Sequence, residues 1–559
     1  MAEILCEKNN QIGWCNVDNL DGCNMIIKNP NNTTGRISKS DVSNGVFMTR
    51  ENAIVGWKEY EFKPPEPVLS LQTSGVAFTA SITANFDSSI QPQKRTGRID
   101  WPDGTNTQIS ANGVFNKSID ASIGIVNIFG NMTQLRINNT FTGSILGVNT
   151  SNVTNMSMMF YYCTNLTGSI PNFNTSNVTN VNNMFSNCWN LTGSIPNFDT
   201  SKVTNMSNMF SNCNKLTGSI PNFNTTNVTS MFQMFQFCNN LTGSIPDFDT
   251  IKVTNMRSMF SYCYNLTGPI PNFDTSNVTS LYAIFCNCRS LTGSIPNFNT
   301  SNVTDMYVMF RDCSNLTGLI PNFDTSNVTN ISSMFSNCRN LTGSIPNFNT
   351  INVTNMSGMF NSCSNLTGSI PNFNTSKVTT SMSSMFFSCT NLIGSIPNFD
   401  TSNVTNMYSM FLSCSNLIGS IPNFNTTKVT NMITVFSYCS NLTGSIPNFN
   451  TINVTTMYEM FNSCRNLTGP IPNFNTSNVT SMGGMFNSCS NLTGSIPNFD
   501  TIKVRNMTNM FYHCSNLTGL IPDFNINNVT NMNNMFRNCI NLTGYNLFTG
   551  TWAQGKGTA

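Results

Sequence analysis

The sequence predicts a mainly β fold: a solenoid of about sixteen coils, preceded by a small β-sandwich and a small N-terminal region. One cysteine returns every 25 residues over most of the chain, as in "MFSNCNKLTGSIPNF" at residues 209–223. A unit of this length cannot bury its own apolar side chains, so neighbouring coils must cover one another. Although only 9% of the 559 residues are charged, 42 Phe and 32 Met supply a core, which argues against a disordered chain.

Residues 1–62 are expected to form a separate N-terminal anchor or attachment region. They carry Cys6, Cys15 and Cys23, whose spacing fits no zinc signature, and no histidine lies among them. We therefore expect core thiols, or one disulfide with a spare cysteine, and no metal site. The proline-rich stretch "KPPEPV" at 63–68 predicts a semi-rigid linker.

Residues 69–130 alternate apolar and polar side chains in the manner of strands, for example in "VAFTASITANF". Asp103-Gly104 is a hairpin turn signal. "IDWPDGT" (99–105) resembles the tryptophan and Asp-Gly turn of polycystic-kidney-disease-type repeats, with Pro102 where that family usually has glycine. The resemblance implies an immunoglobulin-like sandwich. We expect it to cap the solenoid, whose open end would otherwise leave an unpaired strand edge.

The solenoid is expected to span residues 131–547, followed by a C-terminal cap or tail at 548–559. In the coil that begins at Leu191, "LTGSI" predicts a short parallel strand that ends at Pro196, because proline has no N–H for the next rung. "PNFDT" predicts a turn, since Asn, Asp and Thr side chains bond to nearby backbone. "KVTNM" predicts a second, irregular strand, and "SNMFSNC" predicts a helical or 3₁₀ turn.

The repeated cysteine is predicted to form a buried ladder of reduced thiols. A small, weakly polar side chain suits a tight bend, and free cysteine is among the most buried residue types. Disulfides between neighbouring members are the alternative, but a chain without a visible secretory signal favours reduced thiols. One extra residue near Thr380 and Ser381 predicts a local bulge. The ladder consists of Cys163, Cys188, Cys213, Cys238, Cys263, Cys288, Cys313, Cys338, Cys363, Cys389, Cys414, Cys439, Cys464, Cys489, Cys514 and Cys539.

The unit "MFSNCWNLTGSIPNFDTSKVTNM" (184–206) resembles the BspA-like leucine-rich repeats. Their variant "NTSNVTNMSxMFxxC" recurs in surface proteins of bacteria, some protists and large viruses. The resemblance extends from about Ile137 to Leu547, and it implies a curved solenoid of the leucine-rich-repeat type with a non-enzymatic role in adhesion or protein binding. Here "SIPNF" replaces the more usual leucine-rich strand of that family.

Charge and motifs argue against several function classes. A formal net charge of +2 does not favour nucleic acid as a partner. No run approaches the roughly 18 to 20 apolar residues of a transmembrane helix, and the N-terminus shows no standard secretory signal. No phosphate loop, HExxH motif or nucleophile elbow is present, and the single histidine, His513, is expected on the surface. We expect no enzyme activity, no cofactor and no metal.

Acidic residues recur in the "PNF-D/N-T" turn, where a column of carboxylates could bind calcium. Asparagine takes the same place in other coils, for example Asn174, Asn224 and Asn299, so turn stabilisation is the favoured interpretation. The many Asn-x-Ser/Thr triplets are interpreted in the same way, as turn and ladder residues rather than glycosylation sites. The turn aspartates are Asp199, Asp249, Asp274, Asp324, Asp400 and Asp500.

Binding on a solenoid is expected where the repeat varies. Around "MxxMFxxCx" the variable positions hold Tyr, Trp and Arg, the residue types enriched at binding hot spots. They predict a stripe along the rod that binds a host-surface protein or a glycan; ordinary surface variation is the alternative. The stripe residues are Trp189, Arg257, Tyr262, Tyr264, Tyr282, Arg289, Tyr307, Arg311, Arg339, Tyr408, Tyr438, Tyr458, Arg465, Tyr512 and Arg537.

Three hypotheses for the function follow. The first is a surface-exposed adhesive or receptor-binding protein on a virion or cell, for which the missing secretory signal favours a viral or phage fibre or appendage. The second is a structural protein whose solenoids pack into a filament or lattice. The third is a cytosolic interaction scaffold. In the first two, residues 1–62 would attach the chain to copies of itself or to a particle or shell component.

Overall fold

The computed structural model describes residues 67–544 except residues 87 and 122, and elsewhere only the backbone of the strands named below. The chain divides into two compact units, Met1–Val68 and Leu69–Ala559. The first unit holds an antiparallel sheet in the order β2-β1-β3-β5-β6, with β4 paired to β3. The expected thiols or disulfide of residues 1–62 lie outside the described side chains. The strands are β1 (Glu3–Lys8), β2 (Gln11–Asn16), β3 (Asn24–Lys28), β4 (Thr34–Ser38), β5 (Asn44–Glu51) and β6 (Ile54–Glu61).

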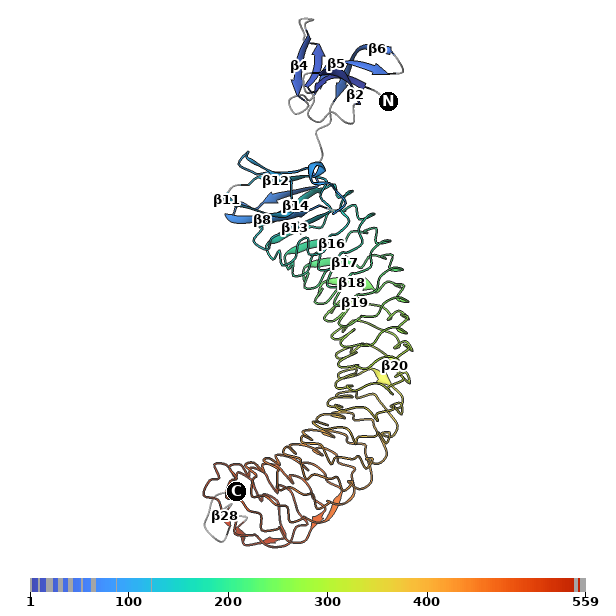
Figure 1. The fold of residues 1–559 in the computed structure, drawn as a ribbon. Helices are drawn as coiled ribbons and strands as arrows, with labels where there is room; N and C mark the ends of the chain where they lie inside the picture. Colours follow the sequence, from blue (N-terminus) through green and yellow to red (C-terminus); the bar gives the residue numbers. More distant parts are fainter. Residues whose placement is uncertain are drawn as a thin grey trace. The chain divides into compact units, whose positions relative to one another are not determined.

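The second unit begins with two antiparallel layers (Figure 1), which we call the cap. One layer has the order β10-β9-β12-β7 and the other β11-β8-β13. Leu71 and Val126 of the first layer line the same small apolar space as Ala80 and Ile82 of the second, so the inner faces pack on each other. The cap consists of β7 (Leu69–Thr73), β8 (Phe78–Asn85), the 3₁₀ helix η2 (Pro92–Lys94), β9 (Gly97–Asp100), β10 (Asn106–Ile109), β11 (Gly113–Ile119), β12 (Ile125–Gly130) and β13 (Gln134–Ile137).

Both layers of the cap run on into the solenoid. Strand β14 (Gly143–Val148) pairs antiparallel with β7 and parallel with β15 (Leu166–Ser169), so Gly143 has Thr73 on one side and Leu166 on the other. In the second layer, Gln134 forms a parallel bridge to Asn155 of the first coil. The cap therefore covers the first strand edge, and residues 69–130 share both sheets with the coils.

The solenoid has about 17 turns. Each coil contributes a short strand that pairs in parallel with the next, for example Gly193 with Leu216. Gly193 has φ +79°, and a Cβ there would lie 3.2 Å from the Cβ of Ser169, so this rung requires glycine. After β15 the strands are β16 (Leu191–Ser194), β17 (Leu216–Ser219), β18 (Leu241–Ser244), β19 (Leu266–Thr267), β20 (Gly318–Leu319), β21 (Leu341–Thr342), β22 (Gly444–Ser445), β23 (Leu467–Pro470), β24 (Leu492–Thr493), β25 (Gly519–Leu520), β26 (Leu542–Thr543), β27 (Tyr545–Asn546) and β28 (Thr551–Trp552).

The solenoid core consists of columns in which each coil adds the same residue type. Phe210 is fully buried and stacks on Phe185 and Phe235 with ring centroids 5.8 Å apart on either side. Each coil covers the apolar side chains of the next, which confirms the solenoid that the 25-residue period predicts. The columns of one coil are Val203, Met206, Met209, Phe210, Cys213, Leu216, Ile220 and Phe223.

The prediction of a helical or 3₁₀ turn in each coil is wrong. In the segment Met206–Cys213, alternate N–H groups donate to the next coil: Asn208 to the Phe232 carbonyl at 2.7 Å and Phe210 to the Met234 carbonyl at 3.0 Å. The N–H of Met209 turns back to the Met206 carbonyl instead. Asn208 has φ +54°, which a right-handed helix excludes. Consecutive turns form here, and η2 is the one helical segment among the described residues.

The cysteine column lies in this core as free thiols. All described cysteines are buried, and none of them is bridged. Burial raises the pKa of these thiols, for Cys238 to about 12. The extra residue forms the predicted bulge: Thr379 donates its N–H to the Thr354 carbonyl, whereas the next coil bonds to Thr380. No helix of the described residues is long and apolar enough to cross a membrane.

Candidate binding face

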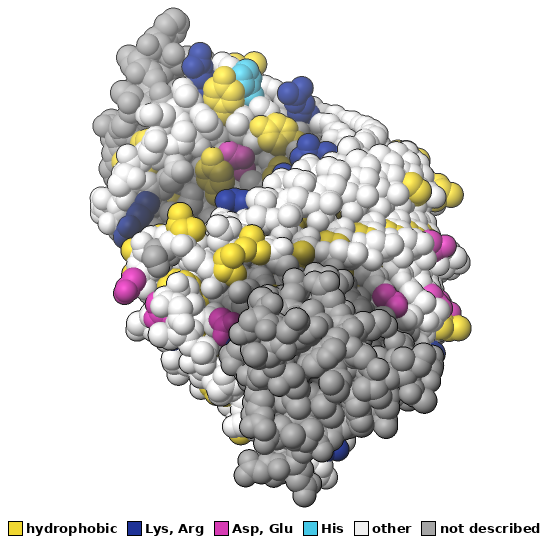
Figure 2. Space-filling view, turned by 90° about the horizontal axis from the view of Figure 1, so that it is seen from above, with side chains coloured by type: hydrophobic (Ala, Val, Ile, Leu, Met, Phe, Trp, Pro, Cys, Tyr) yellow, Lys and Arg dark blue, Asp and Glu magenta, His cyan; other side chains and the backbone are white. Residues whose placement is uncertain are grey.

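In the segment from the first Met to the Cys of each coil, buried core residues alternate with residues that vary between coils, and several of these variable residues are exposed. Met256, Met259 and Phe260 are fully buried, whereas Arg257 between them is exposed. This alternation follows from the backbone bonds to the next coil, which fix every residue of the segment in a column. In Figure 2 most of the described surface is white, and basic and hydrophobic side chains gather around the single histidine. That histidine, His513, is exposed and belongs to the same segment of a late coil.

The structure brings eight of these outward side chains together on four successive coils. We call them the aromatic–arginine patch. One arm runs along the column that begins at Arg257: its guanidinium lies over the Tyr282 ring at 4.7 Å, and the rings of Tyr282 and Tyr307 are 5.3 Å apart. The patch consists of Phe237, Arg257, Tyr262, Tyr264, Tyr282, Arg289 and Tyr307, which are joined by ring and cation–π contacts, and of Arg311, whose charge acts on the Tyr262 phenol.

The second arm of the patch lies on the columns beside the cysteine ladder. Phe237 stacks on Tyr262 with centroids 4.4 Å apart, and Tyr262 meets Tyr264 edge to face at 6.0 Å. The Arg289 guanidinium lies 5.0 Å from the Tyr264 ring centroid. Each contact joins one coil to the next or two neighbouring columns, so the side chains of this arm form one connected row.

Cys286 connects the two arms. It lies in a buried cluster with Ala283 and Val308, against which Tyr282 and Tyr307 pack. Burial raises the pKa of the Tyr262 phenol, and the neighbouring Cys286 raises it further. The phenol thus stays neutral at physiological pH and can donate a hydrogen bond to a partner.

The other predicted stripe residues do not join this patch. A hydrogen bond to Glu459, together with burial and a smaller effect of the nearby Tyr438, raises the pKa of Tyr458 to about 12. Tyr512 makes an edge-to-face contact with His513 at 4.3 Å. The predicted stripe is therefore concentrated in one patch, and its other residues lie elsewhere on the solenoid. Its remaining members are exposed: Trp189, Arg339, Tyr408, Arg465 and Arg537.

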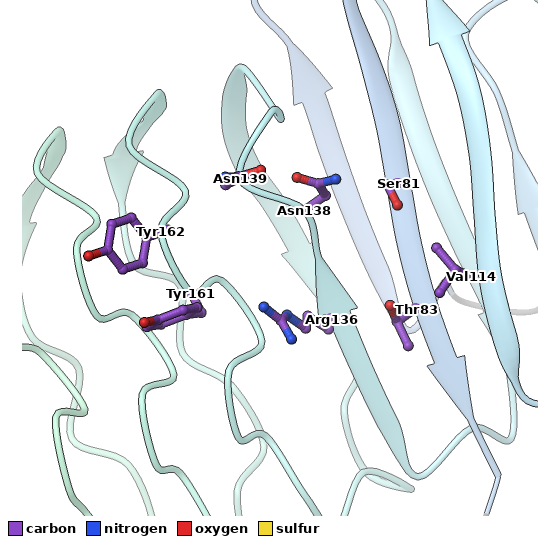
Figure 3. A pocket seen from close by; sticks show the side chains of 8 residues that line it. All are labelled: Ser81, Thr83, Val114, Arg136, Asn138, Asn139, Tyr161 and Tyr162. Carbon is purple, nitrogen blue, oxygen red and sulfur yellow. The ribbon is translucent and has the colours of Figure 1, made fainter.

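Three further residues were missed by the sequence reasoning and line a groove where the cap meets the first coil. They are Arg136 from β13 and the adjacent Tyr161 and Tyr162 (Figure 3). The two tyrosines occupy variable positions just before Cys163, so the column argument could have found them. The groove has a volume of about 510 Å³, and its other lining residues are Ser81, Thr83, Val114, Asn138 and Asn139.

The turn aspartates act within their own coils. Asp274 Oδ1 accepts the Ser276 N–H at 2.9 Å and the Ser276 hydroxyl at 2.6 Å, and these bonds lower the pKa of its carboxyl. Asn174 makes the same two bonds to Ser176. Among residues 67–544, apart from the two left out, no three His, Cys, Asp or Glu side chains lie together as a metal site.

Comparison with known proteins relates the repeats to one family. A family model described as "Mycoplasma protein of unknown function, DUF285" matches residues 125–247, 229–345, 311–400, 356–453, 380–494 and 430–549. These overlapping matches extend over the whole repeat region. No curated protein matches the chain.

Proposed function

Because the chain belongs to the DUF285 family, whose model matches it from residue 125 to 549, we propose that it is a non-enzymatic binding protein on the surface of a cell or virion. It holds a host-surface protein through the aromatic–arginine patch. The observation that carries the proposal is the joining of tyrosines and arginines from three coils, with Phe237 from the coil before them, into one surface. In this proposal the repeats are of the BspA-like type and the two-layered cap is an immunoglobulin-like sandwich.

The patch has the properties of a pre-formed binding surface. Its side chains stand on a backbone that is bonded to coils on both sides, so little conformational entropy is lost when a partner binds. Tyr and Arg supply large contact areas with hydrogen-bonding ends. At about 4.8 Å per coil, four coils make the patch roughly 15 Å long, which suits the centre of a protein interface.

The charge of the patch indicates the partner's chemistry. Among the described residues, Arg257 and Arg289 form no ion pair, and Arg311 pairs with Asp312 at 3.3 Å. Two guanidinium groups held over tyrosine rings are left to meet carboxylates of a partner. We therefore expect a protein surface with acidic residues around an apolar centre.

The test replaces patch residues by the serine that other coils carry at the same position. The variant Tyr264→Ser, Tyr282→Ser, Arg289→Ser follows Ser314 and Ser332, so its coils should fold as those do. The matched control is Tyr408→Ser, Tyr458→Ser, Arg465→Ser, which removes the same residue types outside the patch.

Fluorescently labelled full-length chain is added to host cells, and the bound label is measured by flow cytometry. We expect native chain and control to bind, and the patch variant to bind at least about 10-fold more weakly, as for loss of a hot spot. Equal binding by the patch variant would refute the proposal. Loss of self-association in place of cell binding, measured by sedimentation, would support the filament or lattice hypothesis instead.

A further inference from the structure

We propose that the groove between the cap and the first coil binds a sugar that carries a carboxylate. This site is separate from the aromatic–arginine patch and shares no residue with it. The groove joins two different parts of the described chain, because Arg136 comes from the cap and the tyrosines come from the first coil. The next coil carries Ser186 and Asn187 where the first has Tyr161 and Tyr162, so the repeat itself does not require these tyrosines.

One wall of the groove is a row of side chains across three strands. In the layer β11-β8-β13, Thr83 pairs with Arg136 on one side and with Val114 on the other. Ser81 lies two residues from Thr83 on the same face of β8. This wall therefore presents one cation, two small hydroxyls and a single apolar side chain.

The opposite wall consists of the two tyrosines of the first coil. Their rings meet edge to face with centroids 4.7 Å apart, and the Arg136 guanidinium lies 5.7 Å from the Tyr161 ring (Figure 3). A tyrosine pair at this angle offers an apolar ring face together with a hydroxyl edge. The alternating C–H and O–H groups of a sugar ring fit such a surface.

The polar groups of the groove are free to bind a ligand. Within residues 67–544, apart from the two left out, Arg136 makes no ion pair. No hydrogen bond from another described residue engages the side chains of Thr83, Asn139 or either tyrosine, whereas Asn138 Oδ1 accepts the Thr140 N–H at 3.0 Å. Donors and acceptors thus converge from both walls on a space of about 510 Å³.

The charge balance selects the ligand class. Arg136 is the one charged residue of the lining, so the site suits a ligand with a single negative charge. A planar guanidinium binds a carboxylate through two parallel hydrogen bonds. Because Val114 is the one aliphatic side chain of the lining, a lipid or an apolar peptide anchor would find little surface to cover.

The experiment compares three sugars that differ only in their charged group with one further acidic sugar. Methyl glucuronide, methyl glucoside and methyl glucoside 6-sulfate share one ring, and the methyl glycoside of N-acetylneuraminic acid adds a second carboxylate sugar. Saturation-transfer NMR with the full-length chain measures each affinity. The variants are Arg136→Gln, which removes the charge, and Tyr161→Ser with Tyr162→Ser, which follow Ser186 and Ser362 of other coils. Arg311→Gln is the control for a charge removed elsewhere.

We expect at least one carboxylate sugar to bind, and the neutral glucoside to bind at least about 10-fold more weakly, because a charged hydrogen bond is lost. Arg136→Gln and the tyrosine variant should each weaken the acid by a similar factor, and Arg311→Gln should not. The proposal is overturned if neither carboxylate sugar binds the native chain at millimolar concentration. It is also overturned if the sulfate binds and the carboxylates do not, or if both groove variants bind the acid as the native chain does. These readouts are independent of cell binding by the patch.

Discussion

The thiol of Cys213 lies 3.1 Å from the backbone carbonyl oxygen of Phe185, one coil earlier. The same oxygen also accepts the N–H of Cys188 at 3.1 Å. A carbonyl oxygen can accept two hydrogen bonds, and the Cys213 thiol donates the second one. Every ladder cysteine from Cys188 to Cys539 repeats this contact. The column is therefore a line of weak hydrogen bonds through the core, which explains why an apolar residue does not replace it.

Removing one of these thiols should destabilise the solenoid. Cys213→Ala leaves a small cavity and a carbonyl with one bond fewer, so we expect the free energy of unfolding to fall by about 1–2 kcal/mol. Urea unfolding followed by circular dichroism measures the change. The exposed substitution Trp189→Ser serves as the control and should stay within about 0.5 kcal/mol of the native chain. A midpoint for Cys213→Ala equal to that of the control would contradict the role of the thiol.

The buried thiols should make the solenoid sensitive to alkali. Burial raises the pKa of every ladder cysteine, that of Cys238 to about 12. Well below the unfolded-state thiol pKa of about 8.5, the thiols are protonated in both states and contribute no pH dependence. Between about pH 9 and 12 the unfolded chain releases protons that the folded chain retains, so stability falls by about 1.4 kcal/mol per thiol and pH unit. The urea midpoint should decline steeply over this range. A midpoint that stays constant to pH 11 would show that the thiols are not buried.

The turn aspartates should contribute through hydrogen bonds alone. Asp274→Ala removes the two bonds to Ser276 and should cost about 0.5–1.5 kcal/mol, whereas Asp274→Asn restores the residue type of other coils and should cost less. Hydrogen bonding lowers the pKa of Asp274, so its contribution is present above the unfolded-state pKa and is lost as the pH falls through the folded-state pKa. Thermal unfolding of both variants at pH 7 and at acidic pH measures these effects. Added calcium or a chelator should leave the native midpoint unchanged; a rise with calcium would favour the metal-binding alternative.

Two positions in the Met-to-Cys segment of each coil hold a left-handed backbone, and their residue types should affect stability. Tyr438 has φ +60° and is half exposed, so Tyr438→Asn places a residue that tolerates this conformation and should stabilise the chain by about 0.5–1 kcal/mol. Asn212 has φ +62° at the same column, and Asn212→Val should destabilise by about 1–2 kcal/mol. The two changes are compared by thermal unfolding. Opposite signs are expected, and equal signs would exclude backbone conformation as the cause.

The sequence predicted which residues lie inside but not the path of the backbone between them. Met206, Met209, Phe210 and Cys213 stand at positions i, i+3, i+4 and i+7, which is the spacing of a helix face, and all four are buried. Yet the segment is built from turns, because half of its N–H groups bond to the next coil. One coil read by itself cannot reveal a bond whose acceptor lies about 25 residues away.

The sequence predicted which residue types form the candidate site, but it did not predict which of these residues come together. The variable columns identified Tyr264, Tyr282 and Arg289, since each stands at an outward position of the repeat. Their joining through Cys286 depends on which columns lie side by side, and the periodicity does not specify that. Arg136 lies before the first cysteine of the ladder, so its position beside Tyr161 follows only from the shared sheets of cap and coil.

The identical rungs between coils also bear on how such a gene can change. Because Gly193 pairs with Leu216 as Gly218 pairs with Leu241, loss or duplication of one complete coil would leave every remaining rung with a matching partner. Recombination between the near-identical repeats would then shorten or lengthen the rod in whole coils while its two ends stay the same. The number of coils, and with it the distance between the cap and the C-terminal end, can therefore differ between members of a population, because each added or lost coil uses the same contacts as its neighbours.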